Sequence, residues 1–115
     1  MKTKKINNKK LNYLLPELEK RIKDSFGDKL KKIILYGSYA RGDYDSESDV
    51  DILVLIDDNN LYQYRIIRNK IVSDFLEEFD FIVSIRINDE HIFSDYKNII
   101  PFYKNVLKDG IFLYG

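Results

Sequence analysis

The chain has 115 residues, and its 44% hydrophobic content, with 9 Tyr and 7 Phe, predicts one domain over residues 1–115 with a small core. Lys plus Arg equals Asp plus Glu at 19 each, so the basic excess that holds nucleic acid by charge is missing and we expect no stable nucleic-acid binding. The absence of cysteine excludes disulfides and thiolate metal sites, and without a signal core or an apolar run of ~20 residues we expect a cytoplasmic protein outside the membrane.

The first predicted element is an amphipathic helix. Five of the first ten residues are Lys, which is typical of a solvated tail. Pro16 cannot donate a backbone hydrogen bond and disfavours helix at Leu15. We therefore predict a helix that starts at Pro16 and ends before Gly27, preceded by a separate helical turn over residues 11–15. The apolar positions at helical spacing are Leu11, Leu14, Leu15, Leu18, Ile22 and Phe26.

Three short apolar runs predict strands. The β-branched run at residues 32–36 stops at Gly37, and residues 50–56 form the most apolar stretch of the chain. The third run, residues 81–87, alternates between apolar and polar side chains, and Asp80 introduces it.

Helical patterns lie between and after these strands. One runs from Leu61 to about Phe79, and another starts at Pro101, stops at Gly110 and is followed by a short apolar end. The lone His91 lies in a polar connection, where a structural or solvent-facing role is the simplest interpretation. Strands that alternate with helices predict an α/β fold, in which helices pack on a small sheet with three core strands.

The turn after the first strand carries a possible phosphate site at Gly37-Ser38. Gly37 stands where the backbone must turn sharply, and it has no side chain to block the approach of a phosphate. A Ser in the next position can open a short helix, which brings its hydroxyl close to the first free N–H groups. The same pair also occurs in ordinary turns, so it is weak on its own.

Two carboxylates, Asp49 and Asp51, stand two residues apart at the start of the second strand. Side chains alternate along a strand, so both project from one face with their α-carbons about 6.5–7 Å apart, while Val50 faces the core. Carboxylate oxygens are the ligands that Mg²⁺ prefers. The pair therefore predicts a metal site, with a solvated strand end as the plain alternative.

Other charged residues around this segment have two open interpretations. Asp80 brings a third carboxylate to the cluster if the third strand lies beside the second, and a metal would then relieve the repulsion. Arg41 either contacts a triphosphate or pairs with the loop that follows it. Asp43, Asp45 and Glu47 fit a solvated acidic loop better than direct metal ligation.

The combination of these features carries more weight than each feature alone. At ordinary amino-acid usage, a chain of this length contains Gly37-Ser38, ten residues and Asp49-x-Asp51 by chance on the order of once in a thousand. The pattern resembles the signature of the DNA polymerase beta-like nucleotidyltransferases. The fuller text GSYARGDYDSESDVDILV is similar to the minimal nucleotidyltransferases, including antitoxins paired with HEPN-domain ribonuclease toxins.

The resemblance implies the minimal nucleotidyltransferase fold with a small mixed sheet, and a set of residue roles. Asp49 and Asp51 would hold two Mg²⁺ ions, and the third family carboxylate best matches Asp80, with Glu77 and Glu78 as rivals at the helix end. Gly37 and Ser38 would bind the phosphates of ATP. The implied chemistry is in-line displacement between two metal ions, without a covalent intermediate.

Three functions fit this pattern. The first is an antitoxin that transfers AMP from ATP to a tyrosine of a HEPN toxin partner, an acceptor implied by the resemblance alone. The second is adenylylation of a small-molecule hydroxyl, although relatives of that kind usually carry a further domain for the acceptor. The third is a non-catalytic module that neutralises its toxin by binding alone.

Overall fold

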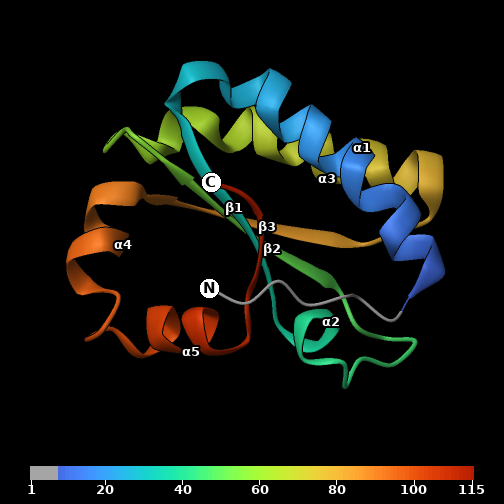
Figure 1. Cartoon of the computed structure of the whole chain (residues 1–115). Coiled ribbons are helices and arrows are strands. Elements are labelled where there is room, and N and C mark those ends of the chain that lie inside the picture. The colour runs from blue at the N-terminus through green and yellow to red at the C-terminus, as the bar shows by residue number, and fades with distance from the viewer. Residues whose placement is uncertain (1–7) are drawn as a thin grey trace.

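The computed structural model describes residues 8–115, so most of the Lys-rich tail lies outside the described residues. A mixed four-stranded sheet in the order β3-β2-β1-β4 forms the middle layer (Figure 1). Strand β1 pairs antiparallel with β2 and β4, whereas β2 and β3 run parallel. The strands are β1 (Leu30–Tyr36), β2 (Val50–Ile56), β3 (Val83–Asp89) and β4 (Ile111–Tyr114).

This arrangement confirms the α/β fold with its small mixed sheet and adds a strand that was not predicted. The apolar end of the chain forms β4 and extends the sheet beyond β1. Four residues are too few for an alternating pattern to identify a strand. Pairing with β1 decides the conformation of this segment.

Helix α1 (Lys9–Phe26) is continuous, so the predicted start at Pro16 was wrong. The side chain of Asn8 caps this helix by accepting a hydrogen bond of 2.9 Å from the backbone N–H of Leu11. Pro16 cannot donate its own backbone bond inside the helix, at a cost of roughly 3 kcal/mol. Burial offsets this cost, because all six apolar positions of the predicted stripe are at most 6% exposed.

The remaining helices follow the predicted pattern in part. The pattern from Leu61 to Phe79 divides into η2 (Leu61–Tyr64) and α3 (Arg65–Phe79), and α5 (Pro101–Asp109) starts and stops as predicted. Two elements were not predicted, a short η1 (Gly27–Lys29) and α4 (Glu90–Tyr96). Among residues 8–115, no helix has the length and apolar character to cross a membrane.

His91 lies on α4 and does have a partner. Its Nε2 atom lies 2.8 Å from Oδ1 of Asp57, just after the end of β2. The His91 side chain is exposed and the Asp57 side chain is half-buried. The hydrogen bond raises the pKa of His91 and lowers the pKa of Asp57. This contact fixes α4 to the sheet, which agrees with a structural role for His91.

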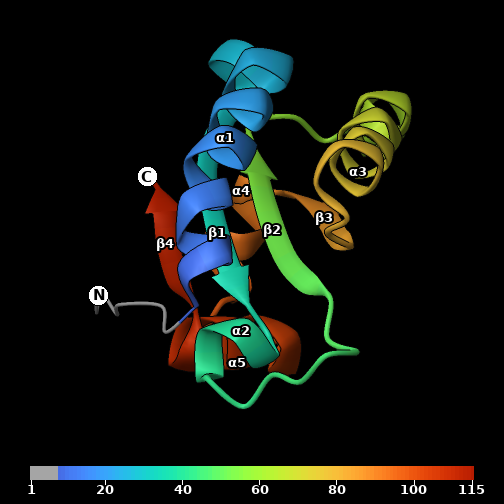
Figure 2. The same ribbon diagram turned by 90° about the vertical axis from the view of Figure 1, so that its right-hand side faces the viewer.

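Both faces of the sheet are covered. Helices α1 and α3 lie on one face, and α4 and α5 lie on the other, as the two views show (Figures 1 and 2). The alternation along β2 follows these layers: Val50, Ile52, Val54 and Ile56 pack toward α1 and α3, whereas Leu53 and Leu55 pack with Phe93 and Tyr103 of α4 and α5. Asp51, near the start of β2, is the only residue of this strand that is not fully buried.

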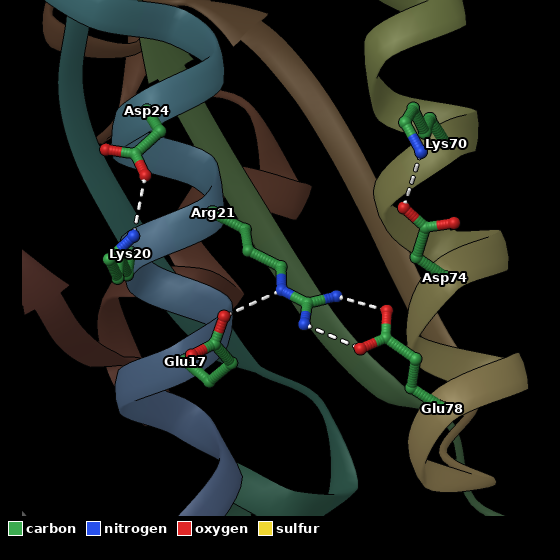
Figure 3. Close-up of polar contacts among 7 residues, drawn as sticks. All are labelled: Glu17, Lys20, Arg21, Asp24, Lys70, Asp74 and Glu78. Carbon is green, nitrogen blue, oxygen red and sulfur yellow. Dashed lines mark hydrogen bonds and ion pairs between the residues drawn. The ribbon is translucent and has the colours of Figure 1, made fainter.

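An ion-pair network joins α1 to α3 across the outer surface (Figure 3). The guanidinium of Arg21 donates two hydrogen bonds to the carboxylate of Glu78, at 2.8 and 2.9 Å, and one of 2.7 Å to Glu17. It also lies over the rings of Phe75 and Phe79, with distances of 5.1 and 5.5 Å to the ring centroids. The hydrogen bonds to Glu78 and Glu17 raise the pKa of Arg21 further above its usual value.

Arg21→Ala should lower the free energy of unfolding by about 1–2 kcal/mol, because it removes a bidentate pair and the aromatic contacts of a side chain that is only 25% exposed. Urea unfolding followed by circular dichroism measures this loss. Lys70→Ala is the matched control, since Lys70 forms a single ion pair with Asp74 on α3 and is 75% exposed. Equal losses in the two variants would contradict a special role for the Arg21 network.

Candidate active site

The turn at Gly37 joins the end of β1 to the short helix α2 (Ser38–Arg41). Gly37 has a φ of 77°, a backbone conformation that residues other than Gly rarely adopt. A Cβ atom at this position would lie only 2.3 Å from Oδ2 of Asp51. Gly37 is therefore required twice, by its backbone conformation and by the closeness of the Asp51 carboxylate.

Helix α2 opens at Ser38, as the sequence predicted. The N–H groups of Ala40 and Arg41 both donate to the carbonyl of Gly37, at 3.1 and 3.0 Å. The N–H groups of Ser38 and Tyr39 belong to the first turn and have no acceptor within the helix. The helix ends at Gly42, which has a φ of 90° and donates to the carbonyl of Ser38 at 2.8 Å.

Asp51 sits on β2 between two neighbours from adjacent strands. Its cross-strand partners are Tyr36 on β1 and Ser84 on β3. The Asp51 side chain is half-buried, and its pKa is raised above the ordinary value, first by this burial and second by the charge of Asp49. Arg41 acts in the opposite direction and favours the charged carboxylate.

Asp49 is the residue before β2 and is solvent-exposed. Val50, between the two carboxylates, is 1% exposed and packs in the core under α1 and α3. This alternation places Asp51 on the side of β2 away from that core, as predicted. Asp49 precedes the strand and does not line the cavity that Asp51 lines, but its charge acts on Asp51.

An open cavity of about 330 Å³ lies in front of Gly37 and Asp51. Helix α2 and the strand ends supply one wall, and α5 supplies the opposite wall. The rings of Tyr36 on β1 and Phe102 on α5 contact each other edge to face, with their centroids 5.3 Å apart. The lining residues are Tyr36, Gly37, Ser38, Arg41, Asp51, Phe102, Asn105, Val106 and Asp109.

The α5 side of this cavity was not predicted. The sequence pattern gives Phe102, Asn105 and Asp109 no part in the site, yet all three line the cavity. Their positions on α5 follow the helical period, with Val106 buried beside them, but only the docking of α5 onto the sheet brings them opposite Gly37. No local sequence signal distinguishes them from an ordinary exposed helix face.

Arg41 pairs with the acidic loop that follows it, which is one of the two interpretations of the sequence, and its contact with a triphosphate stays a prediction. The Nε atom of Arg41 lies 3.2 Å from Oδ2 of Asp43, and Arg41 also lines the cavity. Asp45 shapes the loop instead, since its Oδ1 accepts a hydrogen bond of 2.9 Å from the N–H of Glu47. Tyr39 of α2 and Tyr44 of the loop stack with their ring centroids 4.4 Å apart.

Asp80 does not join the carboxylate pair, and it does not enter β3. It ends α3 in a left-handed conformation with a φ of 55°, and β3 starts only at Val83, opposite Val50. Asp80 is exposed and lines a separate hollow with Glu47 and Phe81. Asp is one of the few residues that tolerate this conformation, which explains its place at the helix end.

The rival acids give no third ligand either. Glu78 is bound to Arg21, and Glu77 lies exposed on α3. Throughout the described part of the chain, no three Asp, Glu or His side chains gather into a group that could hold a metal ion. The residue that stands beside Asp51 on β3 is Ser84.

The sequence matches the model of the nucleotidyltransferase domain family over residues 15–111, which include the whole site. The chain belongs to this family. Relatives of Methanocaldococcus jannaschii described as candidate protein adenylyltransferases support the assignment. MJ0604 is 35% identical over 87% of this chain and 94% of the relative, and MJ1305 is 43% identical over 72% of this chain. The match to MJ1305 spans only 55% of that protein.

Solved structures share the fold of this nucleotidyltransferase domain. A mutant of the toxin–antitoxin MntA–HpeT is 25% identical, with a TM-score of 0.53 over 87% of this chain and 71% of that one. A toxin–antitoxin crystallised with AMP-PNP is 24% identical, with a TM-score of 0.54 over 89% of this chain and 74% of that one. At 24% identity, the similarity to the structure with AMP-PNP concerns the fold alone.

Proposed function

We propose that this chain transfers AMP from Mg-ATP to a hydroxyl group of a partner protein, with a tyrosine of a HEPN-type toxin as the acceptor. The contact between Gly37 and Asp51 carries the proposal. It joins the turn that would bind phosphates to the carboxylate that would bind their metal, in one cavity. The descriptions of the relatives, as protein adenylyltransferases and as part of a toxin–antitoxin pair, favour a protein acceptor.

The carboxylate pair fits a hard divalent cation. Asp49 and Asp51 offer oxygen ligands on one side of β2, and burial together with mutual repulsion disfavours the charged form of Asp51 until a cation is present. When bound, Mg²⁺ would neutralise charge that develops on the triphosphate. Asp49 and Asp51 would hold it.

The other residues of the cavity would orient the substrate. The N–H groups and hydroxyl at Ser38 would bind phosphate oxygens, and the missing side chain at Gly37 leaves room for them. Arg41 would contribute positive charge beside the phosphates. The acceptor oxygen then bonds to the α-phosphorus as the bond to the β-phosphate oxygen breaks, pyrophosphate leaves and the hydroxyl proton passes to solvent.

Intact-mass measurement tests this function directly. The chain is incubated with ATP, Mg²⁺ and the product of its neighbouring gene as the candidate partner, and the mass of both proteins is measured. We expect the partner to gain the mass of one or more AMP groups, located on tyrosine by peptide sequencing. The Asp49→Asn/Asp51→Asn double variant is the matched control and should leave the partner unmodified. An unmodified partner with the natural chain would refute the proposal, and modification of a small alcohol without any partner would identify a different acceptor.

A further inference from the structure

The strand register identifies the residue that stands beside Asp51 on β3. Tyr36, Asp51 and Ser84 lie side by side on β1, β2 and β3. Adjacent strands are about 4.8 Å apart, so Ser84 is the close neighbour of Asp51 on the side facing β3. Val83 and Ile85, on either side of Ser84, pack into the core under α1 and α3, so Ser84 projects toward the opposite face of the sheet.

The α5 face of the sheet at β3 carries positive charge instead of a carboxylate. Arg86 follows Ser84 by two residues and therefore lies on the same face. Its guanidinium carbon stands 4.0 Å from the centroid of the Phe102 ring, which belongs to the wall of the cavity. Arg86 is thus held at the edge of the cavity, on the strand next to Asp51.

The count of ligands decides how many ions the protein can hold. A divalent cation of this kind needs about six oxygen ligands, and two such ions about 3.5–4 Å apart repel strongly unless several carboxylates bridge them. The carboxylates that line the cavity are those of Asp51 on β2 and Asp109 on α5, whereas Asp49 precedes β2 and Asp80 lies apart at the end of α3. Among the described residues, no three acidic side chains gather into a group that could hold a metal ion. Arg41 already favours the charged form of Asp51, and Arg86 adds positive charge where it lies over Phe102 at the cavity wall.

We propose that this site binds one divalent cation per nucleotide, and that Ser84 in the position beside Asp51 is the reason that a second cation is not held. The proposal rests on the proposed function, because it assumes that Asp49 and Asp51 hold the ion of a nucleotide. The family resemblance predicts two ions, whereas this proposal gives one ion, because the residue beside Asp51 on β3 is Ser84 and not a carboxylate. A carboxylate at position 84 would supply the missing ligand.

Equilibrium dialysis with Mn²⁺ and AMP-PNP counts the ions. The excess of Mn²⁺ in the protein compartment is divided by the excess of AMP-PNP in the same compartment. We expect a ratio of one for the natural chain and two for Ser84→Asp. Electron paramagnetic resonance of the Ser84→Asp complex should show the dipolar broadening of two neighbouring Mn²⁺ ions. Ser84→Asn, of similar size but without charge, should keep a ratio of one.

The outcomes separate this proposal from the proposed function. A ratio of two in the natural chain, with AMP-PNP bound, would overturn the one-ion site and leave AMP transfer standing. A ratio of one in folded Ser84→Asp protein would overturn the role of Ser84. No binding of Mn²⁺ or AMP-PNP to the natural chain would overturn the proposed function itself.

Discussion

Gly37→Ala is expected to reduce the rate of AMP transfer by roughly 100-fold or more. The added methyl group would meet Oδ2 of Asp51 at 2.3 Å, so the carboxylate or the turn must move. A displacement of about 1 Å in a site of this kind is enough for a loss of that order. The rate of AMP transfer to the partner and the affinity for AMP-PNP measure the effect.

Gly42→Ala is the matched control for this change. Gly42 also has a positive φ, of 90°, but a Cβ atom there would have no neighbour within 4 Å. Gly42→Ala should cost about 1–2 kcal/mol in stability, because Gly42 has a left-handed helical conformation. Gly37→Ala should cost more, because the ψ of −157° at Gly37 belongs to a region that is essentially restricted to Gly, and urea unfolding measures both costs. Only Gly37→Ala should lose transfer. Equal loss of transfer in both would show that backbone strain, and not the contact with Asp51, controls the site.

Asp51→Asn is expected to reduce transfer by about 1,000-fold or more, because several kcal/mol of charge stabilisation depend on the ion that Asp51 would hold. The same variant should be more stable than the natural chain when no metal is present. Burial and the charge of Asp49 raise the pKa of Asp51, so the folded state holds its proton more tightly than the unfolded state does. Rates and thermal unfolding without metal test the two effects.

The pH dependence of stability follows from the raised pKa of Asp51. A raised carboxyl pKa means that the metal-free natural chain gains stability as pH falls through the pKa of Asp51 in the folded state toward its lower pKa in the unfolded state, and Asp51→Asn should remove that part of the gain. Asp74→Asn, on α3 beside Lys70, is the control and should leave transfer unchanged. Asp51→Asn protein that transferred AMP at the natural rate would contradict the assignment of the metal site.

Variants of the two carboxylates also distinguish, in cells, neutralisation of a toxin by AMP transfer from neutralisation by binding alone. If transfer inactivates the toxin, the Asp49→Asn/Asp51→Asn double variant should fail to protect cells that express it. Full protection by the double variant, at the same protein level, would mean that binding alone neutralises the toxin.

Local signals explain which parts of the fold could be predicted. The strand at residues 50–56 has the predicted bounds, since it combines a long apolar run with turn-forming residues at its end. The helix at residues 101–109 is marked by Pro at its start and Gly after its end. In both, the sequence alone identifies the element and its limits.

The errors arise where tertiary contacts override such signals. Pro16 is a helix breaker by its own chemistry, yet the apolar stripe on both sides of it is buried as one surface, which keeps α1 continuous. Asp80 reads as the first residue of a strand, but α3 extends to Phe79 and uses Asp80 to end the helix. The register of β3 against β2, which places Ser84 beside Asp51, is set by packing of both strands.

The candidate site divides in the same way. Gly37, Ser38, Asp49 and Asp51 could be identified because a short segment of sequence holds all four. The α5 wall with Phe102 and Asn105 could not, because it reaches the cavity only through the fold.

The most direct test of the site is to locate bound nucleotide by NMR on ¹⁵N-labelled protein titrated with AMP-PNP and Mg²⁺. We expect the largest amide shifts at Gly37, Ser38 and Asp51, with smaller shifts on α5. A second cavity of about 300 Å³ lies between α1 and α3, lined by residues such as Arg21 and Ile71, and it serves as an internal control. Shifts confined to that cavity, with the Gly37 and Asp51 amides unchanged, would contradict the account.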